Sequence, residues 1–273
     1  VDAASRSEVV ILAIGLDQTY EGESVDRVRL ALDDDQLKLV DRVLAANHNI
    51  VVVLYNGTPI TMDGWLEKTP AVIEAFYPGQ EGGNALADIL FGDVNPSGKL
   101  PITFPRNEKE TPVANTYPGT KEVANYDEGI FVGYRWYDKE NVEPLFPFGY
   151  GLSYTTFEFS DIKLSKASMT ESDSIFVKVT VTNSGKVAGD EVVQMYISDK
   201  ESSIKREVKS LKGFKRVSLE PGESKTVSMK IDKSALAFYD VDSGSWIVEP
   251  GEFDVLIGNS SRNILLKDSF TIE

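Results

Sequence analysis

The 273-residue sequence contains no cysteine and one histidine. Without cysteine there can be no disulfide framework, no thiolate zinc site and no cysteine nucleophile. A Ser-His-Asp triad would need His48, which follows a helical pattern and stands between two asparagines. A histidine there is expected to cap a helix end or to lie in a turn, because a cation is favourable at a helix C-terminus. We therefore expect no metal site and no cofactor.

Basic residues and long apolar runs are also scarce. There are 28 Lys and Arg against 43 Asp and Glu, which gives a net charge of -15. Nucleic-acid binding depends on basic side chains that neutralise phosphates, so no nucleic-acid partner is expected. The longest apolar run, 9–15, is far shorter than the roughly 20 residues that span a bilayer, so we expect no membrane partner.

The start of the sequence and its charge are relevant to cellular localisation. The sequence begins with Val1 rather than Met, as expected of a processed product or a fragment. It contains no signal-peptide pattern. The acidity favours solubility and fits a secreted or periplasmic setting, but it selects no single location.

The first part of the chain, to about residue 105, alternates strand and helix patterns. Apolar runs at 9–15, 50–57 and 71–79 predict three buried strands, and the first ends in a glycine as a strand buried on both faces can. Helical spacing predicts one helix over 33–47 and a shorter one over 80–93. Strands that alternate with helices are typical of parallel βαβ units.

The last part of the chain changes to a period of two. Ile175, Val177 and Val179 alternate with polar residues, and Pro-Gly turn signals recur at 220–224 and 249–253. Seven or so short strands in this part predict an immunoglobulin-like sandwich. Because there is no cysteine pair, the fibronectin type III variety is expected.

A connector rich in proline, glycine and aromatic residues joins the two parts, at about 106–155. It is too apolar for a disordered linker, so we expect an ordered segment. Its aromatic residues are expected to be core that docks two domains rather than a surface for sugar rings: Tyr126, Phe131, Tyr134, Trp136 and Tyr137.

The predicted fold class is thus α/β followed by all-β. An α/β sandwich domain with a mostly parallel sheet and its connector is expected over 1–155. A fibronectin type III-like domain is expected over 156–273.

Acidic residues follow the first predicted strand. The stretch "YEGESVDR" runs from Tyr20 to Arg27 and contains Glu21 and Glu23. Ligands of parallel sheets bind at the carboxyl ends of strands, where this loop and the two following strand-end loops are expected to meet. A carboxyl group in such a loop can act as a general acid, whereas most loop acids are only solvated. The spacing alone does not choose between these readings.

Five motifs follow one another in the chain: "YEGESVDR", "NGTPI", "EAFYPGQEGGNALADILFGDVNPSGKLPITFP", "YDEGIFVGYRWYD" and "PLFPFGYGLSYTTF". In this order the sequence resembles the C-terminal half of family 3 glycoside hydrolases of the β-glucosidase type. The resemblance covers nearly the whole chain. The sandwich after Phe157 resembles the fibronectin III-like domain that ends many of these enzymes.

This resemblance implies a division of the catalytic groups. Such enzymes carry a nucleophilic aspartate in an S-D-W-like motif on a (β/α)8-type barrel, and no S-D-W occurs in this chain. A barrel domain or chain is therefore an implied partner. The resemblance assigns the general acid/base role to Glu23, three residues before the Asp26–Arg27 pair that is expected to hold the loop.

The resemblance also has departures. Ser24 and Val25 stand where the family often has a glycine and then an aromatic residue that contacts the leaving group. They are therefore the expected substrate-binding residues, and the sequence leaves open whether this subsite has the usual aromatic wall.

The implied function is part of a retaining glycoside hydrolase that acts on β-glucosides or similar β-linked oligosaccharides. The chain would be inactive without its barrel. The alternative is a non-catalytic accessory or structural chain derived from such an enzyme. A stand-alone carbohydrate-binding module is a weaker reading, since Phe214, Tyr239 and Trp246 are few and scattered in the sandwich sequence.

Overall fold

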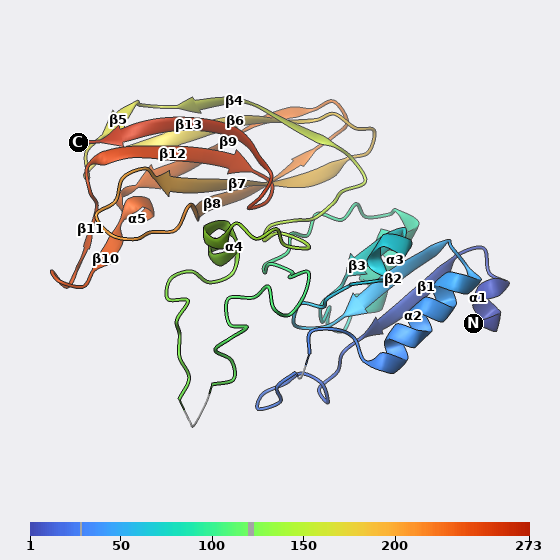
Figure 1. Cartoon of the computed structure of the whole chain (residues 1–273). Helices are drawn as coiled ribbons and strands as arrows, with labels where there is room; N and C mark the ends of the chain where they lie inside the picture. Colours follow the sequence, from blue (N-terminus) through green and yellow to red (C-terminus); the bar gives the residue numbers. More distant parts are fainter. Residues whose placement is uncertain (28, 120–122) are drawn as a thin grey trace. The chain divides into compact units, whose positions relative to one another are not determined.

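The structure is a computed structural model that describes residues 1–27, 29–119 and 123–273 (Figure 1). The contacts divide the chain into two compact units. The first consists of Val1–Asp93 and Phe104–Asn125, and the second of Val94–Thr103 and Tyr126–Glu273. The first holds a parallel sheet with helices and the second a sandwich of strands, so the predicted fold class is confirmed.

The first unit is built on a three-stranded parallel sheet in the order β1-β2-β3. The strands are β1 (Val10–Gly15), β2 (Ile50–Tyr55) and β3 (Ala71–Glu74). The helices are α1 (Asp2–Ser5), α2 (Asp34–Ala46), the 3-10 helix η1 (Leu66–Lys68) and α3 (Gly82–Phe91). In Figure 1, α2 runs alongside β1 and β2, and α3 lies by β3.

The start of α2 is fixed to the end of β1 by side chains. The Asp33 carboxylate caps α2 by accepting hydrogen bonds from the backbone N–H groups of Asp35 and Gln36. The Gln36 amide in turn accepts from the Gly15 N–H at 2.9 Å and donates to the Gly15 carbonyl at 2.8 Å. The carboxyl end of β1, where the acidic loop begins, is therefore held by the first turn of α2.

Two predictions about this sheet are wrong. The run 9–15 was expected to be a strand buried on both faces, but Ile11 is 49% exposed. The third predicted strand, 71–79, is wrong in the same way, because β3 ends at Glu74 and has no buried residue. The reason is position, since β1 and β3 are the edge strands and β2 occupies the centre. The central strand does behave as predicted, since Val52, Val53 and Leu54 are fully buried.

The second unit contains two sheets that face each other across one core. One sheet has the order β4-β6-β9, and the other has the order β5-β13-β12-β7-β8. The strands are β4 (Phe157–Leu164), β5 (Ser168–Met169), β6 (Ser174–Asn183), β7 (Gly189–Asp199), β8 (Ser210–Leu219), β9 (Ser224–Asp232), β12 (Gly251–Gly258) and β13 (Ile264–Ile272). A hairpin of β10 (Phe238–Asp240) and β11 (Ser245–Ile247) and the helices α4 (Tyr134–Glu140) and α5 (Lys233–Leu236) complete it.

The predicted period of two generates the core of this sandwich. On β6, Ile175, Val177 and Val179 are fully buried, and they pack in one cluster with residues of the facing sheet such as Val193 and Val255. Burial of such side chains stabilises a fold by roughly 1.5–3 kcal/mol each. The alternation along β6 therefore specifies which of its two faces lies inside.

A short segment of the N-terminal half belongs to the second unit. Residues 94–103 pair with the chain near Tyr150, where Leu100 donates its N–H to the Tyr150 carbonyl at 2.8 Å. Lys99 forms a largely buried ion pair with Glu191 of β7 at 2.8 Å. Residues 126–155, predicted as part of a domain over 1–155, likewise lie in the second compact unit. The division into domains at residue 155 stays a prediction.

The aromatic residues of the connector are mostly core of the second unit. Phe131 and Tyr137 are buried, and Tyr134 packs edge-on against Tyr196 at 5.8 Å between ring centroids. Tyr126 differs, because it is 79% exposed. Residues 120–122 of the predicted connector lie outside the described residues.

The helices give one further finding. Among the described residues, none of the helices has the length and apolar character needed to cross a bilayer.

Candidate functional site

Three loops meet at the carboxyl ends of the parallel strands, as predicted. The loop after β1 carries Glu21, the loop after β2 carries Gly57 and Thr58, and the segment after β3 carries Tyr77. The Glu21 side chain contacts all three of these residues. Residues separated by up to 56 positions in the sequence are thereby brought together at one edge of the sheet.

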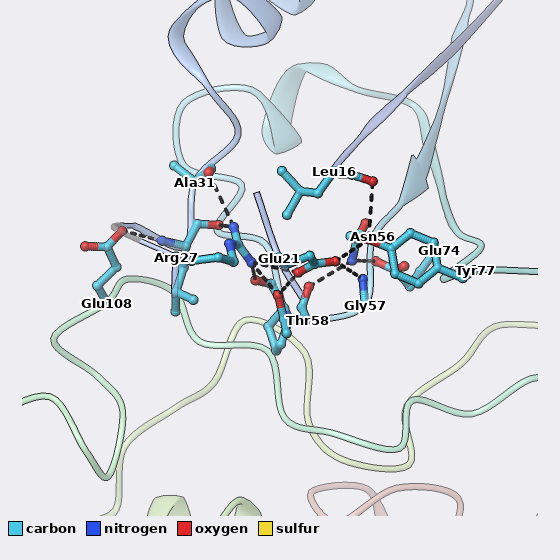
Figure 2. A network of polar contacts seen from close by, with 12 residues as sticks. Leu16, Glu21, Arg27, Ala31, Asn56, Gly57, Thr58, Glu74, Tyr77 and Glu108 are labelled. Atoms are coloured by element: carbon cyan, nitrogen blue, oxygen red, sulfur yellow. Dashed lines mark hydrogen bonds and ion pairs between the residues drawn. The ribbon is translucent and has the colours of Figure 1, made fainter. Parts of the chain in front are cut away.

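Both oxygens of the Glu21 carboxylate accept hydrogen bonds (Figure 2). Its Oε1 atom accepts hydrogen bonds from the Gly57 N–H and, at 2.6 Å, from the Tyr77 hydroxyl. Its Oε2 atom accepts from the Thr58 hydroxyl and lies 3.9 Å from Nη1 of Arg27. The side chain is only 9% exposed. We call Glu21, Arg27, Gly57, Thr58 and Tyr77 the Glu21 cluster.

These partners decide the protonation state of Glu21. Burial raises the pKa of a carboxyl group, but the hydrogen bonds from Thr58, Tyr77 and the Gly57 N–H and the charge of Arg27 outweigh it. The net pKa of Glu21 is lowered from its ordinary value. Conversely, burial and the hydrogen bond to Glu21 raise the pKa of Tyr77 to about 12. Glu21 is therefore an ionised acceptor, and it is not suited to donate a proton.

Gly57 leaves room for this close approach. A Cβ atom at Gly57 would lie 3.0 Å from the Tyr77 ring and 3.1 Å from Oε1 of Glu21. A side chain at this position would therefore crowd the hydrogen bond from the Gly57 N–H to Glu21, and both neighbours would have to shift by a few tenths of an ångström.

Arg27 holds the other end of the loop, as expected. Its guanidinium donates to the Thr58 hydroxyl at 2.6 Å, the Pro59 carbonyl at 2.9 Å and the Leu30 carbonyl at 2.7 Å. Thr58 therefore links Glu21 and Arg27, since its one hydroxyl contacts both. Asp26 interacts elsewhere, by a hydrogen bond with Tyr117 that contributes to raising the pKa of that tyrosine.

Between these two anchored residues the chain makes a tight turn. Val25 donates its N–H to the Gly22 carbonyl at 3.1 Å, so Glu23 and Ser24 occupy the two central positions of a β-turn. Glu23, Ser24 and Val25 are exposed. Two carboxylates that look alike in the sequence therefore differ in the structure. The Glu21 side chain is largely buried and contacts the neighbouring loops, whereas Glu23 is exposed in the turn.

Ser24 has an unusual backbone conformation, with φ at 62°. A left-handed residue at the second central position of a turn is usually glycine, because a Cβ atom is unfavourable there. This is the position at which the family resemblance places a glycine. The turn keeps its conformation in this chain with a serine in its place. Val25, the next residue, is 41% exposed.

A second carboxyl group lies beside the Glu21 cluster. Glu74, the last residue of β3, accepts from the Phe76 N–H at 3.0 Å and from the Asn56 amide at 3.2 Å. Burial raises the pKa of Glu74 to about 7, the two hydrogen bonds oppose this, and the negative charge of Glu21 adds to it. The Asn56 side chain is completely buried, and its Oδ1 atom has no hydrogen-bond partner among the residues that the structure describes.

We expect Glu74→Gln to stabilise the first unit at alkaline pH. The ordinary pKa of 4.5 applies when the chain is unfolded, and the folded value is about 7. Folding therefore favours the protonated form, and the contribution of Glu74 to stability falls as the pH rises from about 4.5 to about 7. A glutamine at this position has no charge, so the free energy of unfolding of the variant relative to wild type should increase by about 2 kcal/mol over this range, after allowance for partial exposure, and then level off.

The measurement is hydrogen exchange of the β2 amides at pH 5 and pH 8, since β2 lies at the centre of the first unit. Glu67→Gln is the matched control, because Glu67 is an exposed glutamate of the same unit. The same pH dependence in wild type and Glu74→Gln would show that Glu74 does not titrate in this range.

Several of these residues were not identified from the sequence. Thr58 and Tyr77 lie in loops that were expected to reach this rim, and Glu74 ends the third strand, but no local pattern marks their side chains. Their strand-end position was the only available signal. Within the described ranges, the acidic and histidine residues include no group of three or more that could hold a metal ion.

Comparison with known families identifies the chain. Residues 1–154 match the family described as "Glycosyl hydrolase family 3 C-terminal domain", and residues 191–261 match "Fibronectin type III-like domain". The chain belongs to glycosyl hydrolase family 3. The resemblance drawn from the motifs, to the C-terminal half of such an enzyme with its fibronectin III-like domain, is confirmed.

Individual relatives agree with this. "Thermostable beta-glucosidase B" of Acetivibrio thermocellus is 49% identical, over 99% of this chain and 36% of that protein. "Beta-glucosidase BoGH3A" of Bacteroides ovatus is 43% identical, over 97% of this chain and 36% of that protein. The solved structure of a Kluyveromyces marxianus β-glucosidase in complex with glucose gives a TM-score of 0.93 at 43% identity, over 100% of this chain and 32% of that one. The chain thus spans about a third of the length of these relatives.

Proposed function

We propose that this chain supplies the general acid/base, Glu23, to a retaining β-glucosidase-type hydrolase whose nucleophile lies on a barrel outside this chain. The observation that carries the proposal is the exposed turn of Glu23 at the carboxyl edge of a parallel sheet. Membership of glycosyl hydrolase family 3 and the names of the relatives support the substrate class, which is β-glucosides or similar β-linked oligosaccharides.

The proposed chemistry is a double displacement. In the first step an aspartate of the barrel attacks the anomeric carbon, and protonated Glu23 donates its proton to the departing glycosidic oxygen. In the second step the Glu23 carboxylate takes a proton from water as the water oxygen attacks the anomeric carbon and displaces the aspartate. Glu23 is then protonated again, and no cofactor is consumed.

Exposure of Glu23 fits this role better than the burial of Glu21. A general acid must come within hydrogen-bond distance of the leaving oxygen, and a side chain at the tip of a turn can do so. Glu21 has both carboxylate oxygens occupied by donors of its own chain. Ser24 and Val25 flank the acid and are proposed to contact the leaving group, with Val25 offering an aliphatic surface in place of an aromatic one.

The test is hydrolysis of cellobiose by the full-length protein that contains this chain and by the 273-residue chain alone. We expect activity in the full-length protein and none in the isolated chain, because one of the two carboxylates is missing from the latter. Activity in the isolated chain would mean that it contains its own nucleophile. Inactivity of the full-length protein on β-glucosides would instead support a non-catalytic accessory chain.

A further inference from the structure

The Glu21 cluster joins three loops through one side chain. One carboxylate collects donors from the loop after β2 and from the segment after β3, although it lies in the loop after β1. The loop containing Glu23 is thus joined to both neighbouring loops through a single side chain. Removal of that carboxylate would leave the Gly57 N–H and the Thr58 and Tyr77 hydroxyls without this acceptor.

Glu21 and Arg27 lie on either side of the turn that contains Glu23. Glu21 precedes Glu23 by two residues and Arg27 follows it by four. The side chains of Glu21 and Arg27 both contact the Thr58 hydroxyl, and the distance from Nη1 of Arg27 is 2.6 Å. Each of these two side chains is 9% exposed. The turn of Glu23 and Ser24 is therefore an exposed segment whose two ends meet on one threonine hydroxyl.

We propose that Glu21 is a positioning residue, whose contacts with Gly57, Thr58, Tyr77 and Arg27 set where the Glu23 carboxyl stands relative to the leaving oxygen. This inference rests on the proposed function of Glu23. It assigns to Glu21 no contact with substrate and no proton transfer. The role is geometric, and a misplacement of about 1 Å in such a group can lower a rate by roughly 10²-fold.

A displaced acid has a recognisable kinetic signature. Cellobiose has a poor leaving group, an alkoxide, which needs protonation as the glycosidic bond breaks. In 2,4-dinitrophenyl β-glucoside the leaving phenolate departs without it. The value of kcat/KM reports only the steps up to this bond cleavage. Misplacement of Glu23 should therefore lower kcat/KM for cellobiose and leave kcat/KM for the dinitrophenyl substrate nearly unchanged.

The experiment compares Glu21→Ala, Glu21→Gln and Tyr77→Phe with wild type in the full-length protein. We expect Glu21→Ala to lower kcat/KM for cellobiose by roughly 10²-fold and that for the dinitrophenyl glucoside by less than about 3-fold. Glu21→Gln keeps one carbonyl acceptor and should lose less. Tyr77→Phe removes one hydrogen bond to Glu21 and should show a smaller effect of the same kind, about 3-fold to 10-fold.

Tyr20→Phe is the matched control. Tyr20 lies beside Glu21 in the same loop, but its hydroxyl hydrogen-bonds Asp33 rather than the Glu21 cluster. It should leave both substrates unaffected. If Glu21→Ala fails to fold, as judged by its thermal unfolding, Tyr77→Phe still tests the inference because it removes only one hydroxyl.

The outcomes separate this inference from the proposed function. Equal losses on the two substrates, or no loss on either, in the Glu21 and Tyr77 variants would overturn a positioning role. Glu23→Gln is measured in parallel. If Glu23→Gln shows the leaving-group dependence and the other variants do not, only the positioning role fails. If Glu23→Gln itself lacks that dependence, the proposed acid/base role of Glu23 fails.

Discussion

Replacement of Glu23 by glutamine is expected to abolish most hydrolysis of cellobiose by the full-length protein. Glutamine has the same shape but no proton to donate, and general acid catalysis typically contributes about 10²–10⁴-fold. We therefore expect kcat/KM for cellobiose to fall by roughly that factor. For 2,4-dinitrophenyl β-glucoside, whose leaving group needs no protonation, kcat/KM should stay within about 10-fold of wild type.

The second step of the reaction, attack by water, provides an independent test of Glu23→Gln. Glu23 also removes the proton from the attacking water, so the glycosyl-enzyme should persist in Glu23→Gln once the dinitrophenolate has left. Azide needs no deprotonation before it attacks. Added azide should therefore raise kcat of the variant on the dinitrophenyl substrate and give a glycosyl azide as product.

A matched substitution controls for loss of one negative charge. Glu8→Gln changes an exposed glutamate at the amino end of β1, the opposite end of the strand from the acidic loop. It should leave both substrates unchanged. Comparable losses on cellobiose and on the dinitrophenyl glucoside in Glu23→Gln, without azide rescue, would contradict an acid/base role.

The two carboxylates of the acidic loop show what the sequence could and could not predict. Both were placed correctly in a loop after a parallel strand, because the apolar run of β1 and its terminal glycine are local signals. Their different surroundings were not predictable from spacing. The donors to Glu21 come from residues 36, 37 and 56 positions away, so they depend on the tertiary fold. Only the family resemblance favoured Glu23.

The strands of the sandwich show a similar limit. β6 was predicted because its apolar residues alternate with polar ones without interruption, whereas β4 was not predicted. In β4 the register with β6 shifts between Ser160 and Lys163, and Asp161 has φ at 54°. This irregularity adds one residue between Phe159 and Ile162, although both pack against the same core, so the period of two that marks a strand is broken.

One expectation about aromatic residues needs correction. Tyr239 and Trp246 were described as scattered, yet they are direct partners across the β10–β11 hairpin, with ring centroids 5.7 Å apart. Phe214 lies on β8 and takes no part in this pair. The pairing depends on hairpin register, which the sequence between the two strands did not reveal.

The largest stability effect is expected from Gly15→Ala, at the end of β1 where the acidic loop begins. Gly15 lies directly opposite Tyr55 of β2 with φ at 153°. A Cβ atom there would stand 1.9 Å from the Tyr55 carbonyl oxygen and 2.6 Å from its carbon. Backbone atoms cannot rotate away as a side chain can, so the pairing of β1 with β2 must open at this point.

Gly15→Ala would also disturb the structure next to the loop that contains Glu23. Gln36 holds the N–H and the carbonyl of Gly15, so a displaced Gly15 disturbs the cap of α2 together with the sheet. We expect a loss of about 3 kcal/mol or more in the free energy of unfolding of the first unit. Urea unfolding, with hydrogen exchange of β2 amides as the reporter, measures it.

Gly83→Ala is the matched control because the same methyl group in α3 would meet none of the described atoms within 4 Å, apart from its chain neighbours and the backbone of its own helix. Alanine is a better helix former than glycine, so this variant should gain about 1 kcal/mol. Opposite signs for one substitution in one unit would show that Gly15 is required by the close approach of Tyr55. If Gly15→Ala were as stable as wild type, the β1–β2 register at the start of the Glu23 loop would have to differ from the one described. The contacts of Glu21 with the loop after β2 depend on that register, so the positioning role proposed for Glu21 would then need revision as well.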